Sequence, residues 1–318
     1  MNAPAAITAA RTHPPSAWSL SGVVDALCAA NEDLLHGKHR KEGRRALPSR
    51  EVLTGVVSGL RAALFPWHFG TADVSEQGLV YYVGRTLDAS LTALERQVHV
   101  GLLFDCGHDA DPCEACARRA TAVTRELAAR LPAIRALLGR DARAAYEGDP
   151  AATSPDETVF SYAGMTAITY HRIAHELHGL GVPLIPRMIS ELAHAATGID
   201  IHPGAQIGPR FFIDHGTGVV IGETCVIGEH VRLYQGVTLG AKSFPSDERG
   251  NPIKGIPRHP IIEDDVVIYA GATVLGRITV GHGSSIGGNV WLTHSVPPGS
   301  QIAQARPREE VFSDGAGI

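Results

Sequence analysis

Apolar residues return at every sixth position over a long stretch of the chain, from Ile201 to Leu292. A period of six fits neither the turn of an α-helix nor the two-residue alternation of a β-strand. It is typical of a parallel β-helix, in which each six-residue unit forms one flat side of a triangular coil. We therefore predict that these side chains fill a prism whose interior is buried by stacked coils. The clearest run comprises Ile262, Ile268, Val274, Val280, Ile286 and Leu292.

The residues before this repeat show a helical pattern instead. One apolar face, with steps of three and four, comprises Val80, Val83, Leu87, Leu91, Leu94 and Val98. Such spacing places side chains on one side of a helix. Further helices are expected at 117–131, 133–146, 165–180 and 186–196. We therefore expect an all-α domain, which would cover the open end of the first coil.

The six-residue period is broken at two places. Val219 and Val220 add two residues between the units that begin at Ile213 and Ile221. The second break, residues 241–260, contains four Pro and two Gly and cannot form flat coils. It must leave the prism as a loop, and such loops often form walls of binding sites.

The predicted fold class is therefore α+β, with an N-terminal helical domain followed by a C-terminal parallel β-helix. The expected parts are a disordered leader at 1–20, the helical domain at 21–197, the β-helix at 198–300 and a tail at 301–318.

The composition excludes several classes of function. The chain has 318 residues, 44% of them hydrophobic, and a net charge of -5, which suits two domains and argues against a nucleic-acid partner. No apolar run approaches the ~20 residues that a membrane span requires. The leader has no uninterrupted apolar segment, so we do not interpret it as a signal peptide. Five cysteines, an odd number, favour a reducing cytoplasm.

Two groups of residues have metal-ligand spacing. Cys106, His108, Cys113 and Cys116 combine a Cys-x-His with a Cys-x-x-Cys, which could supply four ligands to a zinc ion. They are also consistent with reduced thiols packed in a core. His171, His175 and His178 share one helical face, which could bind metal or be merely amphipathic.

Polar residues with catalytic potential gather in the first coil and at the end of the long loop. Asp200 precedes His215 by fifteen positions, slightly less than one coil of about eighteen residues. A carboxylate that holds an imidazole in place makes a general base, although both side chains could simply be solvated corner residues. Arg258 and His259 close the loop and could bind a carboxylate or an oxyanion.

At these positions the sequence resembles the bacterial serine O-acetyltransferase family over about 141–299. The matching motifs are Asp-Ile-His-Pro at 200–203, Asp-His-x-Thr-Gly-x-Val-x-Gly-Glu-Thr at 214–224, Val-Thr-Leu-Gly at 237–240, Arg-His-Pro at 258–260, Gly-Asp-Pro-Ala at 148–151 and Tyr-His-Arg-Ile-Ala-His at 170–175. The combination is more specific than the hexapeptide repeat, which many acyltransferases share.

The resemblance implies a left-handed β-helix and direct transfer of an acetyl group from acetyl-CoA to the hydroxyl of L-serine, the committed step towards cysteine. It implies no metal requirement for this catalysis. By resemblance, His215 is the general base and Asp200 its orienting partner. The residues expected to bind serine are Asp149, Asp214, Arg258, His259 and Glu223, and those expected along the CoA arm are Gly240, Ala241, Ala270 and Gly271.

The resemblance also implies partners. Acyltransferases of this kind form trimers, and the helical domain could join two trimers. The terminal Ile318 matches a residue with which the family binds O-acetylserine sulfhydrylase. Two features depart from the common form, because the extruded loop is longer and Ser284-Ser285 replaces a basic residue expected near the CoA phosphate. Arg277, His282 and Lys242 are alternative partners for that phosphate.

Three other functions remain open from the residues alone. A hexapeptide acetyltransferase for a sugar or another hydroxyl or amine would keep His215 without needing the amino-acid-binding residues. A β-helix of the zinc carbonic anhydrase type would bind metal through residues such as His202, His215, His230 or His259. A scaffold protein that binds its partner through Ile318 would not need His215 at all.

Overall fold

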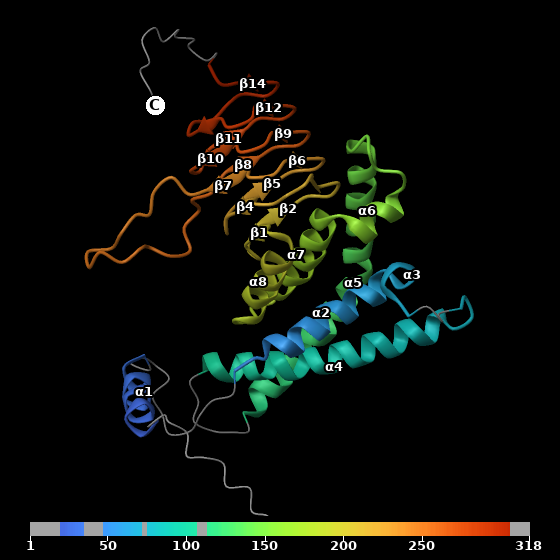
Figure 1. Cartoon of the computed structure of the whole chain (residues 1–318), viewed down its shortest axis with the longest axis vertical. Helices are drawn as coiled ribbons and strands as arrows, with labels where there is room; N and C mark the ends of the chain where they lie inside the picture. Colours follow the sequence, from blue (N-terminus) through green and yellow to red (C-terminus); the bar gives the residue numbers. More distant parts are fainter. Residues whose placement is uncertain (1–19, 35–46, 72–74, 107–112, 306–318) are drawn as a thin grey trace, which may run out of the picture. The chain divides into compact units, whose positions relative to one another are not determined.

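The computed structural model describes residues 20–34, 47–71, 75–106 and 113–305, with the backbone alone at 31–34 (Figure 1). The chain forms two compact units, residues 1–45 and 46–318. The first contains helix α1 (Ser21–Leu34). Apart from Leu20, the predicted leader lies outside the described residues, as do His108 and Ile318. No helix in the described ranges has the length and apolar character that a membrane crossing requires.

The second unit begins with a group of helices, whereas the helical domain expected at 21–197 also included α1 of the first unit. The helices of the second unit are α2 (Arg50–Leu64), α3 (Pro66–Phe69), α4 (Leu79–Cys106), α5 (Glu114–Gly148), α6 (Pro155–Ser161), α7 (Ala163–Gly179) and α8 (Ile185–Thr197). Helix α2 packs on α4, and α7 packs on α8. The apolar face predicted around 80–98 is buried only towards its end, since Leu94 is fully buried while Val80 is 76% exposed.

Helix α5 corrects the prediction of two separate helices at 117–131 and 133–146. It continues through Pro132 as one element. Proline removes one backbone hydrogen bond from a helix interior and normally favours a break. Here Leu127, Leu131, Ile134 and Leu138 form one buried stripe across the proline, so packing outweighs the lost bond.

The predicted β-helix is confirmed, and it has the left-handed form. Its short parallel strands stack into three sheets, with the strand orders β1-β4-β7-β10-β13, β11-β8-β5-β2 and β14-β12-β9-β6-β3. We call the first of these the first sheet. The strands are β1 (Asp200–Ile201), β2 (Gln206–Ile207), β3 (Phe212–Ile213), β4 (Val220–Ile221), β5 (Val226–Ile227), β6 (Arg232–Leu233), β7 (Thr238–Gly240), β8 (Ile261–Ile262), β9 (Val267–Ile268), β10 (Thr273–Leu275), β11 (Thr279–Val280), β12 (Ser285–Ile286), β13 (Trp291–Leu292) and β14 (Gln301–Ile302).

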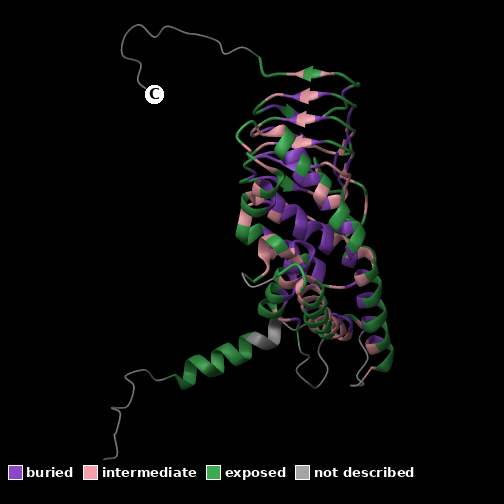
Figure 2. Cartoon of the chain, turned by 90° about the vertical axis from the view of Figure 1, so that its right-hand side faces the viewer, coloured by how far each residue is buried: buried purple, intermediate pink, exposed green. Residues whose placement is uncertain are grey.

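The aliphatic residues at the predicted six-residue steps fill the interior of the prism. Ile262, Ile268, Val274, Val280, Ile286 and Leu292 are all at most 1% exposed. Figure 2 shows buried residues within the coils and in the helices beside them. The core of the prism is therefore continuous with the core of the helical domain.

The first break in the repeat lies slightly earlier than the sequence suggested. Val219 is a buried corner residue and Val220 belongs to β4, so both occupy regular repeat positions. The extra pair lies in the preceding turn, because six residues, 214–219, join β3 to β4, whereas four join β6 to β7. This widened turn carries Asp214 and His215.

The second break is the extruded loop, as predicted. Thr273 pairs with Thr238 although it lies 35 positions later, whereas Thr238 pairs with Val220 only 18 positions before it. The loop projects away from the coils (Figure 1) and is pinned by an antiparallel bridge between Ser246 and Pro252. It returns to the prism at Arg258 and His259, immediately before β8.

A buried ion pair joins the helical domain to the β-helix. The guanidinium of Arg172 in α7 donates to both carboxylate oxygens of Asp141 in α5, at 2.7 and 3.0 Å. It also donates to the carbonyl oxygens of Ile207 and Gly208 in the first coil. Asp141 in turn accepts from the backbone N–H of Phe211 at 3.0 Å. The helices are thereby fixed to the coil that carries the candidate site.

Candidate active site

The predicted site residues form two clusters on opposite sides of the first sheet, one where its strands begin and one where they end. We call these two sides the edges of the sheet, as distinct from its outermost strands. The carboxylate cluster, at the turn between β3 and β4, comprises Asp149, Tyr162, Asp214, His215 and Arg232. The arginine cluster, beyond the other end of β4, comprises His202, Glu223, Thr224, Arg258 and His259. Among the described residues, no hydrogen bond or ion pair joins the two clusters within one chain.

The carboxylate cluster holds two ionised carboxylates beside an exposed imidazole. Asp149, which follows α5, accepts from Tyr162 Oη at 2.5 Å and from the backbone N–H of Ala151 at 2.8 Å. The Tyr162 hydrogen bond, followed by that of Ala151, lowers the pKa of Asp149. The same contact raises the pKa of Tyr162 to about 12. Tyr162 therefore remains a donor and Asp149 an anion at neutral pH.

The second carboxylate of this cluster, Asp214, is held by Arg232. The guanidinium donates to Asp214 Oδ2 at 2.9 Å and lies over the rings of Phe212 and Tyr234. Because the side chain of Asp214 is only 11% exposed, its carboxylate has a fixed position. The Nδ1 atom of His215 lies 3.8 Å from Asp214 Oδ1. Asp214 thus lies between the guanidinium of Arg232 and the imidazole of His215.

His215 has a left-handed backbone conformation, with a φ angle of 59°, and five other non-glycine residues of the described ranges, among them His230 and Asp265, also have a positive φ. A residue other than glycine is strained in this left-handed region, and such strain is concentrated at functional sites. The imidazole is 70% exposed. The turn therefore presents the ring to solvent rather than packing it.

Asp200 lies on β1, close to the turn between β3 and β4, because it pairs with Val220 at the end of that turn. Its carboxylate is within 4.8 Å of ligand atoms of Glu191 and His194 in α8. Among the described residues, no hydrogen bond joins Asp200 to His215. The orienting role of Asp200 therefore stays a prediction.

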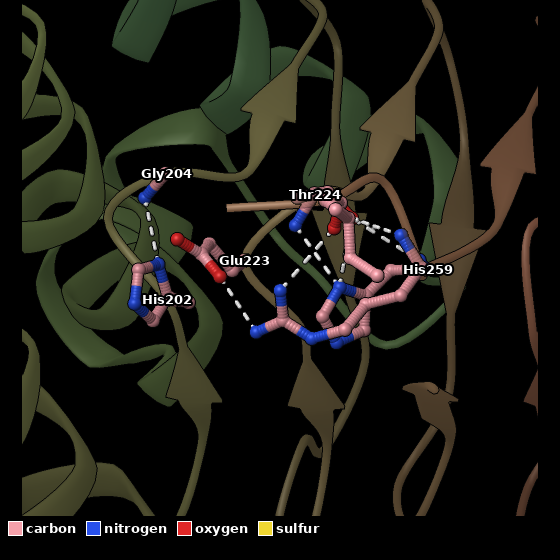
Figure 3. A network of polar contacts seen from close by, with 7 residues as sticks. His202, Gly204, Glu223, Thr224 and His259 are labelled. Atoms are coloured by element: carbon pink, nitrogen blue, oxygen red, sulfur yellow. Dashed lines mark hydrogen bonds and ion pairs between the residues drawn. The ribbon is translucent and has the colours of Figure 1, made fainter. Parts of the chain in front are cut away.

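The arginine cluster is organised around the hydroxyl of Thr224 (Figure 3). This oxygen accepts from the backbone N–H of Arg258 at 2.9 Å and from that of His259 at 3.1 Å. The guanidinium of Arg258 donates to Glu223 Oε2 at 2.6 Å. Burial raises the pKa of Glu223, but the hydrogen bond and charge of Arg258 outweigh it and leave the pKa below its usual range. The end of the extruded loop is thus attached to the corner after β4.

His259 is a buried neutral imidazole. Its Nδ1 accepts from the backbone N–H of Thr224 at 3.1 Å, so the ring proton belongs on Nε2. Burial, followed by the charge of Arg258, lowers the pKa of His259 to about 4. At neutral pH this ring can donate a hydrogen bond through Nε2 but cannot serve as the base. The ring fills the space where Gly222 would carry a Cβ atom.

The glycines and alanines predicted along the CoA arm are divided in the same way. Gly240 and Ala241 lie at the edge of the first sheet that carries the arginine cluster. Ala270 and Gly271 lie at the other edge, in the turn between β9 and β10. Gly271 has a φ angle of 71°, and a Cβ there would lie 2.3 Å from Asn289 Oδ1, so stacking of the coils itself demands glycine.

The two predicted metal groups behave differently. Cys106, Cys113 and Cys116 come together, with their sulfur atoms within 4.8 Å of one another. His171, His175 and His178 form no comparable ligand group among the described residues. Burial holds the pKa of His171 well below its usual range, and His175 Nδ1 donates to the carbonyl oxygen of Pro203.

Three residues of the site escaped the sequence analysis. Tyr162, Arg232 and Thr224 each hold a predicted residue in place, but none stands next to it in the chain. Of these three residues, only Thr224 lies in a motif already singled out, the one at 214–224. Contacts across 13 to 34 positions depend on the fold and leave no local pattern.

Solved structures with the same architecture identify the class of protein. Serine acetyltransferase isoform 3 from Entamoeba histolytica, in complex with cysteine, matches 93% of this chain and 95% of its own, with 32% identity and a TM-score of 0.70. A Neisseria gonorrhoeae serine acetyltransferase in complex with serine matches 80% of this chain and 97% of its own, with 26% identity and a TM-score of 0.52. The fold and the site define an acyltransferase built on a left-handed β-helix.

The sequence comparison identifies the family. A serine acetyltransferase from Synechococcus elongatus is 54% identical over 311 residues, which cover 97% of this chain and 98% of the relative. No family model matches the sequence. The chain belongs to the serine acetyltransferase family.

Proposed function

We propose that this protein transfers the acetyl group of acetyl-CoA directly to the hydroxyl of L-serine, giving O-acetyl-L-serine and CoA. The observation that carries the proposal is the carboxylate cluster, where an exposed imidazole lies beside two fixed anions. A serine hydroxyl becomes a competent nucleophile only when a base removes its proton during attack. His215 is that base, and Asp200, close to the same corner, is its orienting partner.

The two carboxylates of the cluster bind the ammonium group of serine. Asp149 and Asp214 face the space beside His215, and their hydrogen bonds from Tyr162 and Arg232 keep each in one position. A cation held between two ionised carboxylates is fixed in direction as well as in place. The hydroxyl of the bound serine is thereby directed at the imidazole.

The arginine cluster binds the carboxylate of serine. Arg258 retains donors beyond the one used by Glu223, and a guanidinium suits a carboxylate because it offers two parallel N–H groups. Glu223 fixes the direction of the guanidinium. His259 donates through Nε2, either to the substrate or to the oxyanion that develops on the acetyl carbonyl.

The reaction needs no covalent enzyme intermediate. The serine oxygen attacks the thioester carbonyl carbon while His215 takes the hydroxyl proton. The tetrahedral intermediate then collapses, the C–S bond breaks, and the proton passes from His215 to the sulfur of CoA. A thioester is reactive enough for direct attack once both substrates are held together.

The separation of the two clusters supports a trimer as the active form. The clusters occupy the two edges of the first sheet, so a cyclic arrangement of prisms brings the carboxylate cluster of one chain to the arginine cluster of the next. The groove between prisms then holds the CoA arm, with Gly240 and Ala241 on one wall and Ala270 and Gly271 on the other. Exposed Val80 and Tyr81 on α4 support a second contact, between trimers.

Lys242 is the best-placed partner for the CoA phosphate. It is exposed, and it follows Ala241 on the wall of the proposed groove. Arg277 is engaged instead with the carbonyl oxygens of Thr224 and His259, and His282 lies at a different corner, near Asp265. Binding of O-acetylserine sulfhydrylase through Ile318 remains a proposal from the sequence.

The test is release of free thiol from acetyl-CoA with L-serine, compared with sugars and other hydroxyl or amine acceptors. We expect serine-dependent release, and a His215→Ala variant should lose a factor on the order of 10² to 10⁴ in kcat. Arg258→Ala should mainly raise the KM for serine. Equal turnover with a sugar acceptor, or full activity in a folded His215→Ala variant, would overturn the proposal.

A further inference from the structure

Three cysteines meet where α4 ends and α5 begins, in the helical domain. Cys106 is the last residue of α4, while Cys113 precedes α5 and Cys116 lies in its first turn. Their sulfur atoms all lie within 4.8 Å of one another, and all three thiols are free. None of them belongs to the carboxylate or the arginine cluster, so the proposed acetyl transfer leaves them without a role.

The surroundings of the three sulfur atoms suit a bound cation with thiolate ligands. Cys113 and Cys116 lie at the N-terminus of the long helix α5. A cavity of about 240 Å³ adjoins the sulfurs, and Arg119 and Asp105 are among its lining residues. Three thiolates and a divalent cation carry one net negative charge, Asp105 adds a second, and Arg119 would offset one of the two.

The geometry favours a metal over a disulfide. Tetrahedral zinc thiolates have Zn–S bonds of about 2.3 Å, which places the sulfur atoms roughly 3.8 Å apart. The sulfur atoms of the three cysteines lie at most 4.8 Å apart, only about 1 Å more than in such a zinc site. Small rotations about the side-chain bonds can close this difference. A disulfide would use two sulfurs and leave the third without a function.

We propose that Cys106, Cys113 and Cys116 bind one zinc ion, with the fourth coordination position open to a further donor. The ion would connect the end of α4 to the start of α5 across the segment that joins them. It would stabilise this helix pair and take no part in acetyl transfer. The inference does not depend on the function proposed above.

The first experiment measures metal in the intact protein. Reduced protein, freed of metal with a chelator and dialysed, is mixed with zinc and passed through a desalting column before elemental analysis. We expect one zinc per chain, and with cobalt a thiolate-to-metal charge-transfer band in the near ultraviolet. Zinc retention no higher than that of a Cys106→Ser/Cys116→Ser double variant would overturn the proposal, as would a spontaneous disulfide detected by intact mass.

A single substitution separates a metal site from packed thiols. Cys113 is the N-cap of α5, and its side chain makes no capping hydrogen bond. Serine is a preferred N-cap residue, so without a metal Cys113→Ser should leave the thermal midpoint unchanged or raise it. With a metal, the zinc-loaded variant should melt about 5 °C below the zinc-loaded parent, and chelator should lower the midpoint of the parent alone.

Cys28→Ser is the matched control, because Cys28 is exposed on α1 in the other unit of the chain. It should retain one zinc and the full response to chelator. Thiol release with serine should persist in Cys113→Ser below its melting range. Undiminished zinc binding by Cys113→Ser would overturn the assignment of the ligands.

Discussion

At the scale of single residues, Asp149 depends on a tyrosine that lies 13 positions away. Tyr162 donates to its carboxylate at 2.5 Å, and this hydrogen bond is the main cause of its lowered pKa. A hydrogen bond to a charged group typically contributes about 1.5–3 kcal/mol, and less where water competes. Asp149 is only partly buried, so we take the lower end of that range.

Tyr162→Phe should therefore weaken serine binding while leaving the fold intact. Without the phenol the pKa of Asp149 rises, so the carboxylate is protonated at a higher pH than in the parent. We expect a rise of roughly tenfold in the KM for serine, equal to about 1.4 kcal/mol. We also expect the acidic limb of kcat/KM to move to higher pH. The KM for acetyl-CoA is the internal control, and an unchanged acidic limb would contradict the role of Tyr162.

The two histidines of the proposed site show why residue type alone does not give a role. His215 is exposed on a strained turn, whereas His259 is buried with Nδ1 already accepting a hydrogen bond. The sequence showed both as histidines near interruptions of the repeat. The burial of His259 and its hydrogen bond from Thr224, like the exposure of His215 in the widened turn, are defined only by the folded coils.

At the scale of elements, the Asp141–Arg172 pair is the main polar connection between α5, α7 and the first coil. Both side chains are buried, with 0% and 6% exposure. Burial raises the pKa of Asp141, and the charge and hydrogen bonds of Arg172 oppose this rise. A buried pair of this kind contributes little as a whole, but removal of one partner leaves an unpaired charge and is costly.

Arg172→Ala should therefore lower the free energy of unfolding by about 3–5 kcal/mol in urea titrations followed by circular dichroism. Arg130→Ala is the matched control, because Arg130 pairs with Glu176 between the same two helices but is 37% exposed. Its loss should cost at most about 1 kcal/mol. An Asp141→Asn/Arg172→Met double variant should recover part of the loss; equal destabilisation by the two alanine variants would contradict the argument.

Regular elements could be predicted from the sequence because their periods are written in it. The six-residue steps gave the prism, and the pattern before them gave the helices. Pro132 misled the prediction, since its local cost is outweighed by a buried stripe that becomes visible only in three dimensions. The prediction also placed the two extra residues of the widened turn a few positions too late, at Val219 and Val220. Only the structure shows that these two valines occupy regular repeat positions.

At the scale of the whole molecule, the residues that we propose to bind serine lie in two separate clusters of one chain. The carboxylate cluster lies at one edge of the first sheet and the arginine cluster at the other, and the residues predicted to bind CoA are divided in the same way. The sequence predicted the residues of both clusters, but nothing in it distinguished one composite cluster from two. In the trimer that we propose, a serine molecule that contacts both clusters lies between two chains.

Mixed assemblies of two impaired variants, assayed at a serine concentration far below the KM of the Arg258→Ala variant, test this arrangement. His215→Ala and Arg258→Ala chains, each with its own affinity tag, are co-expressed and purified through both tags in turn. A site needs an intact His215 from one chain and an intact Arg258 from the next, so each trimer that contains both variants should have one complete site, about a third of its sites. Thiol release should then reach about a third of the wild-type rate, although each variant alone is nearly inactive at this serine concentration. If both halves came from the same chain, every site in the mixture would lack one half, and the mixture would be as inactive as its components. Wild type co-expressed with the His215→Ala/Arg258→Ala double variant is the control, because it gives the activity that assembly itself permits.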